Sequence, residues 1–263
     1  AEARRKCGRV ILMENQVASD RSAGRSTGSS LKKRSGERGS SLRDYSLGEE
    51  ITNAITHGIG AALAVAALVI LIVKSVVDGA GVLLLSALVY GIALLLEYLM
   101  STLYHAIAHR GAKRVFKVLD HCGIYLLIAG TYTPVCLIVL GNKSGYRMLS
   151  LVWGIAIVGI IINALWINCP KWFSSVIYIA MGWVCIMAIR QIVAALTPAA
   201  FAWLLAGGII YTIGGVIYAL KLPIFNAKHK NFGSHEVFHV FVMLGSVCHF
   251  VVMYFFVAGM AIH

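Results

Sequence analysis

The sequence predicts an all-α membrane protein, a bundle of seven helices that each cross the bilayer. Of its 263 residues, 59% are hydrophobic and only 13% are charged, whereas a soluble domain carries about a quarter charged residues. Acidic residues are especially scarce after residue 50, where only four of the 11 lie. Seven apolar segments follow one another with short breaks, and each has roughly the 20 residues that a spanning helix needs.

The breaks between the predicted spans carry turn residues or charges. Three of the four prolines, Pro170, Pro198 and Pro223, lie at breaks. Pro134 lies inside a span, where we expect a kink. The spans are expected at residues 51–73, 82–107, 118–140, 147–167, 172–193, 199–220 and 235–258.

The chain divides into two parts by composition. Residues 1–47 are rich in Ser, Gly and Arg and show no apolar periodicity, so we predict a disordered basic tail. Residues 48–263 are expected to form the seven-helix membrane domain, with no second soluble domain and no internal repeat.

The basic residues predict how the chain is oriented. With the tail in the cytoplasm, the inner loops hold eight Lys and Arg residues and the outer loops hold four, so the positive-inside rule favours a cytoplasmic N-terminus. The formal net charge of +12 comes from the tail and from residues that flank apolar segments. That distribution fits an anionic lipid surface better than nucleic acid. We therefore expect a multi-pass protein of the plasma membrane, the inner membrane in a bacterium, with membrane lipids rather than nucleic acid as partners.

The few ionisable side chains inside the predicted spans gather at one membrane depth. Such groups are costly in a bilayer and by default indicate function. Ser101 and His105 are four residues apart, as are His235 and His239, so each pair shares one helix face. The second span runs toward the cytoplasm, and the third and seventh run away from it. His105, Asp120 and the two late histidines should therefore meet near the cytoplasmic face.

These residues have the chemistry of a catalytic zinc site. Three imidazoles with a fourth open position are a known ligand set of such sites, so we predict that His105, His235 and His239 bind zinc. Zinc activates a bound water at neutral pH. We expect Asp120 to take or give the proton of that water, and Ser101 to hydrogen-bond the water or a substrate oxygen.

Three further residues are expected beside the ligands. Glu50 and His57 should lie at the same depth as the histidines, either behind the ligands or at the interface. Glu236 belongs to the stretch "HEVFH", which has the H-E-x-x-H pattern of a zinc protease. One residue turns a helix by about 100°, so Glu236 need not face a metal that His235 binds. The motif also opens the last span, so no later span can supply a third protease ligand, and a protease is disfavoured.

Four stretches of the chain resemble the hemolysin III family. They are "SLGEEITNAITHGIG", "EYLMSTLYH", "VLDHCGIYLLIAGTYTP" and "SHEVFHVFVMLGSVCHF". This family is the bacterial branch of the progestin and adiponectin receptor (PAQR) superfamily, which is similar to alkaline ceramidases. The resemblance implies a seven-helix membrane fold with zinc at its cytoplasmic end. The family's S-x-x-x-H motif falls on Ser101 and His105, its aspartate on Asp120, and its H-x-x-x-H motif on His235 and His239.

The function that we expect is a zinc-dependent hydrolase of a lipid amide or ester, linked to membrane lipid homeostasis. The superfamily relatives imply hydrolysis of a lipid amide such as ceramide. One alternative is a non-enzymatic membrane regulator or receptor in which zinc ties the spans together. Another is a cytolysin, as the family's name suggests, although the sequence shows no secretion signal and no amphipathic pore-forming segment.

Overall fold

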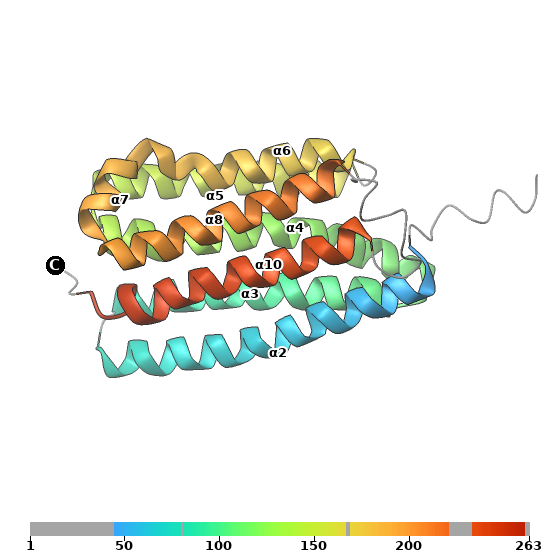
Figure 1. Ribbon diagram of the computed structural model, residues 1–263, viewed down its shortest axis with the longest axis horizontal. Helices are drawn as coiled ribbons and strands as arrows, with labels where there is room; N and C mark the ends of the chain where they lie inside the picture. Colours follow the sequence, from blue (N-terminus) through green and yellow to red (C-terminus); the bar gives the residue numbers. More distant parts are fainter. Residues whose placement is uncertain (1–44, 80, 167–168, 221–232, 261–263) are drawn as a thin grey trace, which may run out of the picture. The chain divides into compact units, whose positions relative to one another are not determined.

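The computed structural model describes residues 45–79, 81–166, 169–220 and 233–260, and this part of the chain is almost entirely helical (Figure 1). Seven of its helical segments are long and apolar enough to cross a membrane. They are α2 (Leu47–Val77), α3 (Gly81–Ala106), α4 (Arg110–Pro134) with η1 (Val135–Leu140), α5 (Lys143–Leu165), α6 (Lys171–Gly182) with η2 (Trp183–Ala188) and α7 (Ile189–Ala195), α8 (Pro198–Leu220), and α10 (Ser234–Val251) with η3 (Val252–Val257).

The predicted seven-helix fold is therefore confirmed, and each predicted span overlaps one of these segments. The predicted tail lies outside the described residues up to residue 44. The cytoplasmic placement of the N-terminus stays a prediction.

Local sequence signals explain where helices begin. Ser46 precedes α2, where its backbone N–H donates to Glu49 Oε2 at 2.6 Å and its hydroxyl accepts from the Glu49 N–H at 3.3 Å. This reciprocal pair is a capping box. Asn142 starts α5 by accepting two backbone N–H groups of the first turn. Both caps satisfy donors that would otherwise have no partner at the helix end.

Two spans change helix type along their length. After Pro134, where we expected a kink, α4 continues as the π-helical segment η1, since proline removes a backbone donor from the helix. The fifth span contains the 3₁₀ segment η2, which the sequence did not predict because no proline marks it. There the Tyr132 hydroxyl donates to the Gly182 carbonyl at 2.6 Å and accepts from the Cys185 N–H at 2.9 Å. These contacts stabilise the change of helix type.

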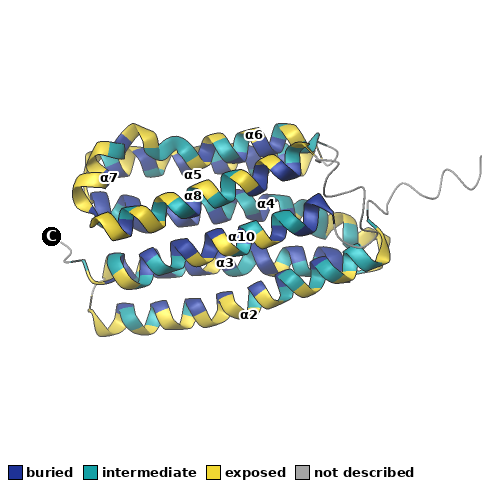
Figure 2. Ribbon diagram, in the orientation of Figure 1, coloured by how far each residue is buried: buried dark blue, intermediate teal, exposed yellow. Residues whose placement is uncertain are grey.

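The contacts between spanning segments close into a ring. Each span packs against its neighbours in sequence, and α10 packs against both α8 and α2. The span formed by α4 and η1 is the most enclosed of the seven. In its most apolar stretch 67% of the residues are buried, compared with 50% in α3, the second most enclosed span. Figure 2 shows exposed residues along the outward side of α2 and other peripheral helices. Many of the exposed residues of α2 are large hydrophobics, as expected when lipid replaces water as the solvent.

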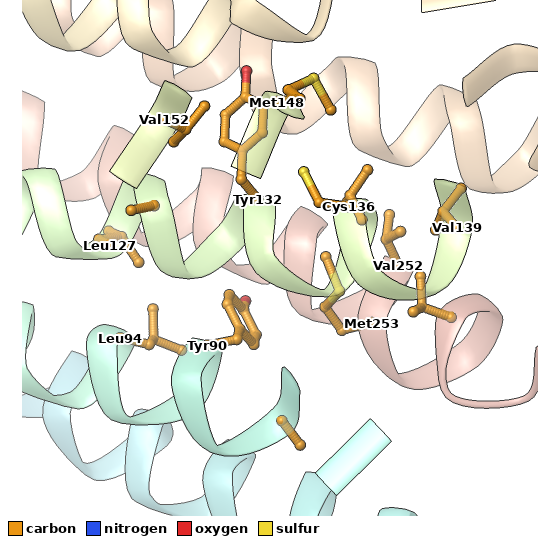
Figure 3. Close-up of a cluster of buried hydrophobic side chains, with 14 of the residues drawn as sticks. Tyr90, Leu94, Leu127, Tyr132, Cys136, Val139, Met148, Val152, Val252 and Met253 are labelled. Carbon is orange, nitrogen blue, oxygen red and sulfur yellow. The ribbon is translucent and has the colours of Figure 1, made fainter. Parts of the chain in front are cut away.

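The apolar core takes buried side chains from all seven spans, and Figure 3 shows the part that α3, α4, η1, α5 and η3 form. Large buried side chains fill the space between these segments, and they include Tyr90, Leu94, Leu127, Val152 and Val252. The buried ionisable side chains lie largely outside this core, toward the start of α2, the end of α3 and the start of α10. The packed core therefore fixes the helices whose ends carry the site.

Candidate metal centre

Three helix ends meet on one side of the bundle. There α2 begins, α3 ends and α10 begins, and α2 contacts both of the other helices (Figure 1). His105 is the residue before the last of α3, and His235 is the second residue of α10. The alternating direction of consecutive spans thus brings residues that are 130 positions apart to one level.

His105, His235 and His239 converge at this end. One ring nitrogen of each lies within 4.8 Å of the others, and all three side chains are buried. The Nε2 atoms of His105 and His235 are 3.1 Å apart. Tetrahedral zinc with bonds of 2.0–2.1 Å would hold two nitrogens about 3.3 Å apart. The three predicted ligands therefore form a cluster that could hold one metal ion.

The ring of His105 is held from behind by a carboxylate of α2. His105 Nδ1 lies 2.8 Å from Glu50 Oε2, and the other carboxylate oxygen lies 2.8 Å from Lys113 Nζ. Lys113 also donates to the Tyr104 carbonyl at 3.0 Å. A ligand histidine commonly uses its second nitrogen in this way, so His105 Nε2 faces the cluster. The sequence predicted Glu50 at this level but placed Lys113 only in a loop.

His239 is supported by two side chains of α2. The His57 ring stacks on the His239 ring with centroids 3.5 Å apart, and Thr56 Oγ1 lies 3.4 Å from His239 Nδ1. Thr56 donates its own proton to the α2 backbone, so it accepts from Nδ1 and leaves Nε2 for a metal. Neither ring nitrogen of His57 has a hydrogen-bond partner among the described residues. His57 therefore acts on His239 through packing.

The Glu236 carboxylate is held by hydrogen bonds within the protein. It is fully buried. Its Oε1 accepts from Asn53 Nδ2 at 2.7 Å, and its Oε2 accepts from the Gly233 N–H at 2.6 Å. The carboxylate thus caps α10 and joins it to α2, and both of its oxygens are occupied. This geometry suits a residue beside the ligands better than the base of a protease.

Ser101 and Asp120 are both buried. The Ser101 hydroxyl has no hydrogen-bond partner among the described residues and lies one turn from His105 on the same helix. Asp120 is not among the described groups that could share one metal ion with the three histidines. The catalytic roles assigned to Ser101 and Asp120 stay predictions.

An apolar cavity of about 170 Å³ lies between α4, α6, α8 and α10. Tyr218 and Phe238 line it next to the cluster, since the Tyr218 ring lies 5.4 Å from the His235 ring and 4.8 Å from the Phe238 ring. Its walls continue along the bundle through Leu127, Ile128, Ile192, Phe201 and Leu204. The cavity therefore extends from beside the histidines into the apolar part of the bundle.

The contact between Glu50 and His105 predicts that Glu50→Ala weakens metal binding by about 10–100-fold. The His105 ring would lose the partner that fixes its orientation, while all three imidazoles remain. Competition against a chromogenic chelator at constant pH measures the affinity. Glu49→Ala is the matched control, because Glu49 contacts the cap residue Ser46 in the same helical turn. Equal affinity in the two variants would show that Glu50 does not support the centre.

Comparison with known proteins identifies relatives for most of the chain. Residues 45–250 match the family model described as Haemolysin-III related. Hemolysin-3 of Bacillus cereus is 42% identical over 210 residues, 80% of this chain and 92% of the relative. Hemolysin-3 homolog of Bacillus subtilis (strain 168) is 38% identical over 212 residues, 81% and 96% of the two chains. Adiponectin receptor protein of Drosophila melanogaster is 28% identical over 154 residues, 52% of this chain and 34% of the relative.

These matches confirm the predicted resemblance to the hemolysin III family, including its link to adiponectin receptors. Seven apolar helices and bacterial relatives indicate a multi-pass protein of the bacterial inner membrane, as predicted. The family model spans the helices that carry all three clustered histidines. The chain therefore belongs to the haemolysin-III related family of integral membrane proteins.

Proposed function

We propose that this protein is a zinc-dependent intramembrane hydrolase that cleaves a lipid amide or ester near the cytoplasmic face. The observation that carries the proposal is the position of three buried, convergent histidines beside an apolar cavity. A metal centre alone fits many functions. A metal centre next to a space suited to a hydrocarbon chain favours a lipid substrate.

Zinc suits the donor set of this centre. His105, His235 and His239 offer three nitrogen ligands, whereas calcium and magnesium prefer oxygen ligands. The contacts of His105 with Glu50 and of His239 with Thr56 leave the Nε2 atoms directed at the centre. When bound, zinc supplies Lewis acidity and activates water at neutral pH.

The chain's own residues would position the substrate. A lipid chain that enters the cavity from the bilayer exchanges one apolar environment for another, so packing against the apolar wall would hold it with its carbonyl at the histidines. The Ser101 hydroxyl, which has no partner among the residues that the structure describes, would donate a hydrogen bond to the substrate oxygen as charge develops there. Asp120 would accept a proton during the attack and return it to the leaving group. The family's similarity to alkaline ceramidases favours an amide bond.

Fatty acid release from a lipid amide by the purified protein tests the proposal. We expect release that stops when a chelator removes the metal, returns when zinc is added back, and is absent in His105→Ala. Thermal unfolding of His105→Ala controls for a general loss of structure. Full release by His105→Ala would refute the mechanism.

A second candidate is a non-enzymatic membrane regulator or receptor with structural metal. The histidines come from two helices, α3 and α10, so a bound ion would join them, and one relative bears the name adiponectin receptor protein. This candidate predicts that a chelator lowers the thermal stability while no lipid is turned over. The name Hemolysin-3 of the Bacillus relatives suggests a cytolysin, and release of dye from liposomes would support that function.

A further inference from the structure

A buried carboxyl group interrupts the apolar wall of the cavity. Glu97 of α3 is the cavity-lining residue that carries a carboxyl group, and it is 2% exposed. Its Oε2 atom is completely buried and has no hydrogen-bond partner among the described residues. A buried polar atom without a partner costs about 1–3 kcal/mol, and more if the group is charged. The lipid cleavage proposed above gives Glu97 no role.

The fold makes specific room for this carboxyl group. Gly123 of α4 faces Glu97, and a Cβ atom at Gly123 would overlap Glu97 Oε2. The carboxyl group is therefore packed against the backbone of α4. The side chain thus has a defined place, and because Glu97 also lines the cavity, a polar group of a ligand there can approach its carboxyl group.

Glu97 lies on the same helix as the metal-centre residue His105. Glu97 precedes His105 by eight residues on α3, about 12 Å along the helix axis. Ser101 lies midway between them on the same face. Tyr218 and Phe238 connect the cavity to the histidine cluster. A lipid whose carbonyl lies at the histidines would therefore pass Glu97 several carbon atoms further along its chain.

We propose that Glu97 is a specificity-determining residue that hydrogen-bonds a hydroxyl group carried by the lipid chain in the cavity. A hydroxyl group both donates and accepts, so it can pair with a carboxyl group in either protonation state. The inference rests on the proposed function only in taking the cavity as the site of the lipid chain. It narrows the substrate class to lipids with a hydroxylated chain.

The pairing has a measurable consequence for selectivity. A chain without the hydroxyl would leave Glu97 Oε2 without a hydrogen-bond partner, as it is among the described residues. Chains hydroxylated at the matching carbon should bind about tenfold more tightly than the unsubstituted chain. Glu97→Leu should remove this preference, because leucine offers no hydrogen bond. Glu97→Gln should keep it, because the amide can donate and accept in the same place.

Fatty acid binding tests this inference without requiring turnover. The probes are octadecanoic acids that differ only in which carbon carries a hydroxyl group, with unsubstituted octadecanoic acid as the reference. Each displaces cis-parinaric acid from the full-length protein in detergent, and the displacement gives its affinity. Wild type and Glu97→Gln should prefer one positional isomer, and Glu97→Leu should bind all isomers equally. Metal content and thermal unfolding verify the fold of each variant, and Glu97→Met replaces Glu97→Leu if that variant does not fold.

Two results would overturn the inference. One is equal binding of every isomer by wild type. The other is a preference that survives intact in Glu97→Leu or Glu97→Met, because the selecting group would then lie elsewhere. Absence of lipid hydrolysis would refute the proposed enzyme while leaving the binding preference measurable, so the two failures are distinguishable.

Discussion

His235→Ala is expected to abolish stoichiometric metal binding by the purified protein. The cluster offers three nitrogen ligands within 4.8 Å of one another, and the loss of one leaves too few to retain an ion through purification. The loss should exceed the roughly 10–100-fold that removal of a supporting contact costs. Elemental analysis of wild type and variant, purified in parallel, measures the effect and also identifies the metal.

His121→Ala is the matched control for this experiment. His121 lies on α4, and its Nδ1 contacts the Lys117 carbonyl at 2.7 Å, but it is outside the described three-histidine cluster. We expect this variant to keep its metal. Metal retained in His235→Ala, or missing from wild type, would contradict the ligand assignment.

The cluster could be predicted from sequence because its geometry depends on two simple regularities. A four-residue spacing places His235 and His239 on one helix face, and the alternating direction of spans sets the depth at which His105 meets them. These regularities give the helix face and the depth of the histidines, and the resemblance to the hemolysin III family implied that they lie side by side. The same argument explains why the seven spans themselves were predicted, since span length follows from bilayer thickness.

The supporting contacts could not be predicted, because they depend on lateral packing. The hydrogen bond between Asn53 and Glu236 joins residues that are 183 positions apart in the sequence. It exists only because α2 lies beside α10. Lys113 was assigned to a loop because the predicted span began only at residue 118. In the structure α4 begins at Arg110, before the apolar segment. The charged residues in the first turns of α4 lower the hydropathy of this stretch, so the sequence did not indicate that it is helical. That Glu97 Oε2 has no hydrogen-bond partner among the described residues likewise follows from what surrounds it and cannot be seen in the sequence.

Asp120→Asn is expected to lower the rate of lipid hydrolysis by about 10²–10⁴-fold. Asparagine has the same shape as aspartate but cannot accept the proton that the reaction releases. Metal binding should be unchanged, because Asp120 is outside the described group of metal-sharing side chains. The turnover rate and the metal content are measured on the same sample.

The pairing of these two measurements separates a catalytic role from a structural one. Loss of rate at full metal content assigns Asp120 to proton transfer, whereas loss of both would make it a support of the centre. Asp78→Asn is the matched control, since Asp78 follows the C-terminal end of α2 and pairs with Lys74 at 3.2 Å. Full turnover in Asp120→Asn would move the proton carrier to another group. The metal centre would stand in that case, because its evidence is the geometry of the three histidines and is independent of Asp120.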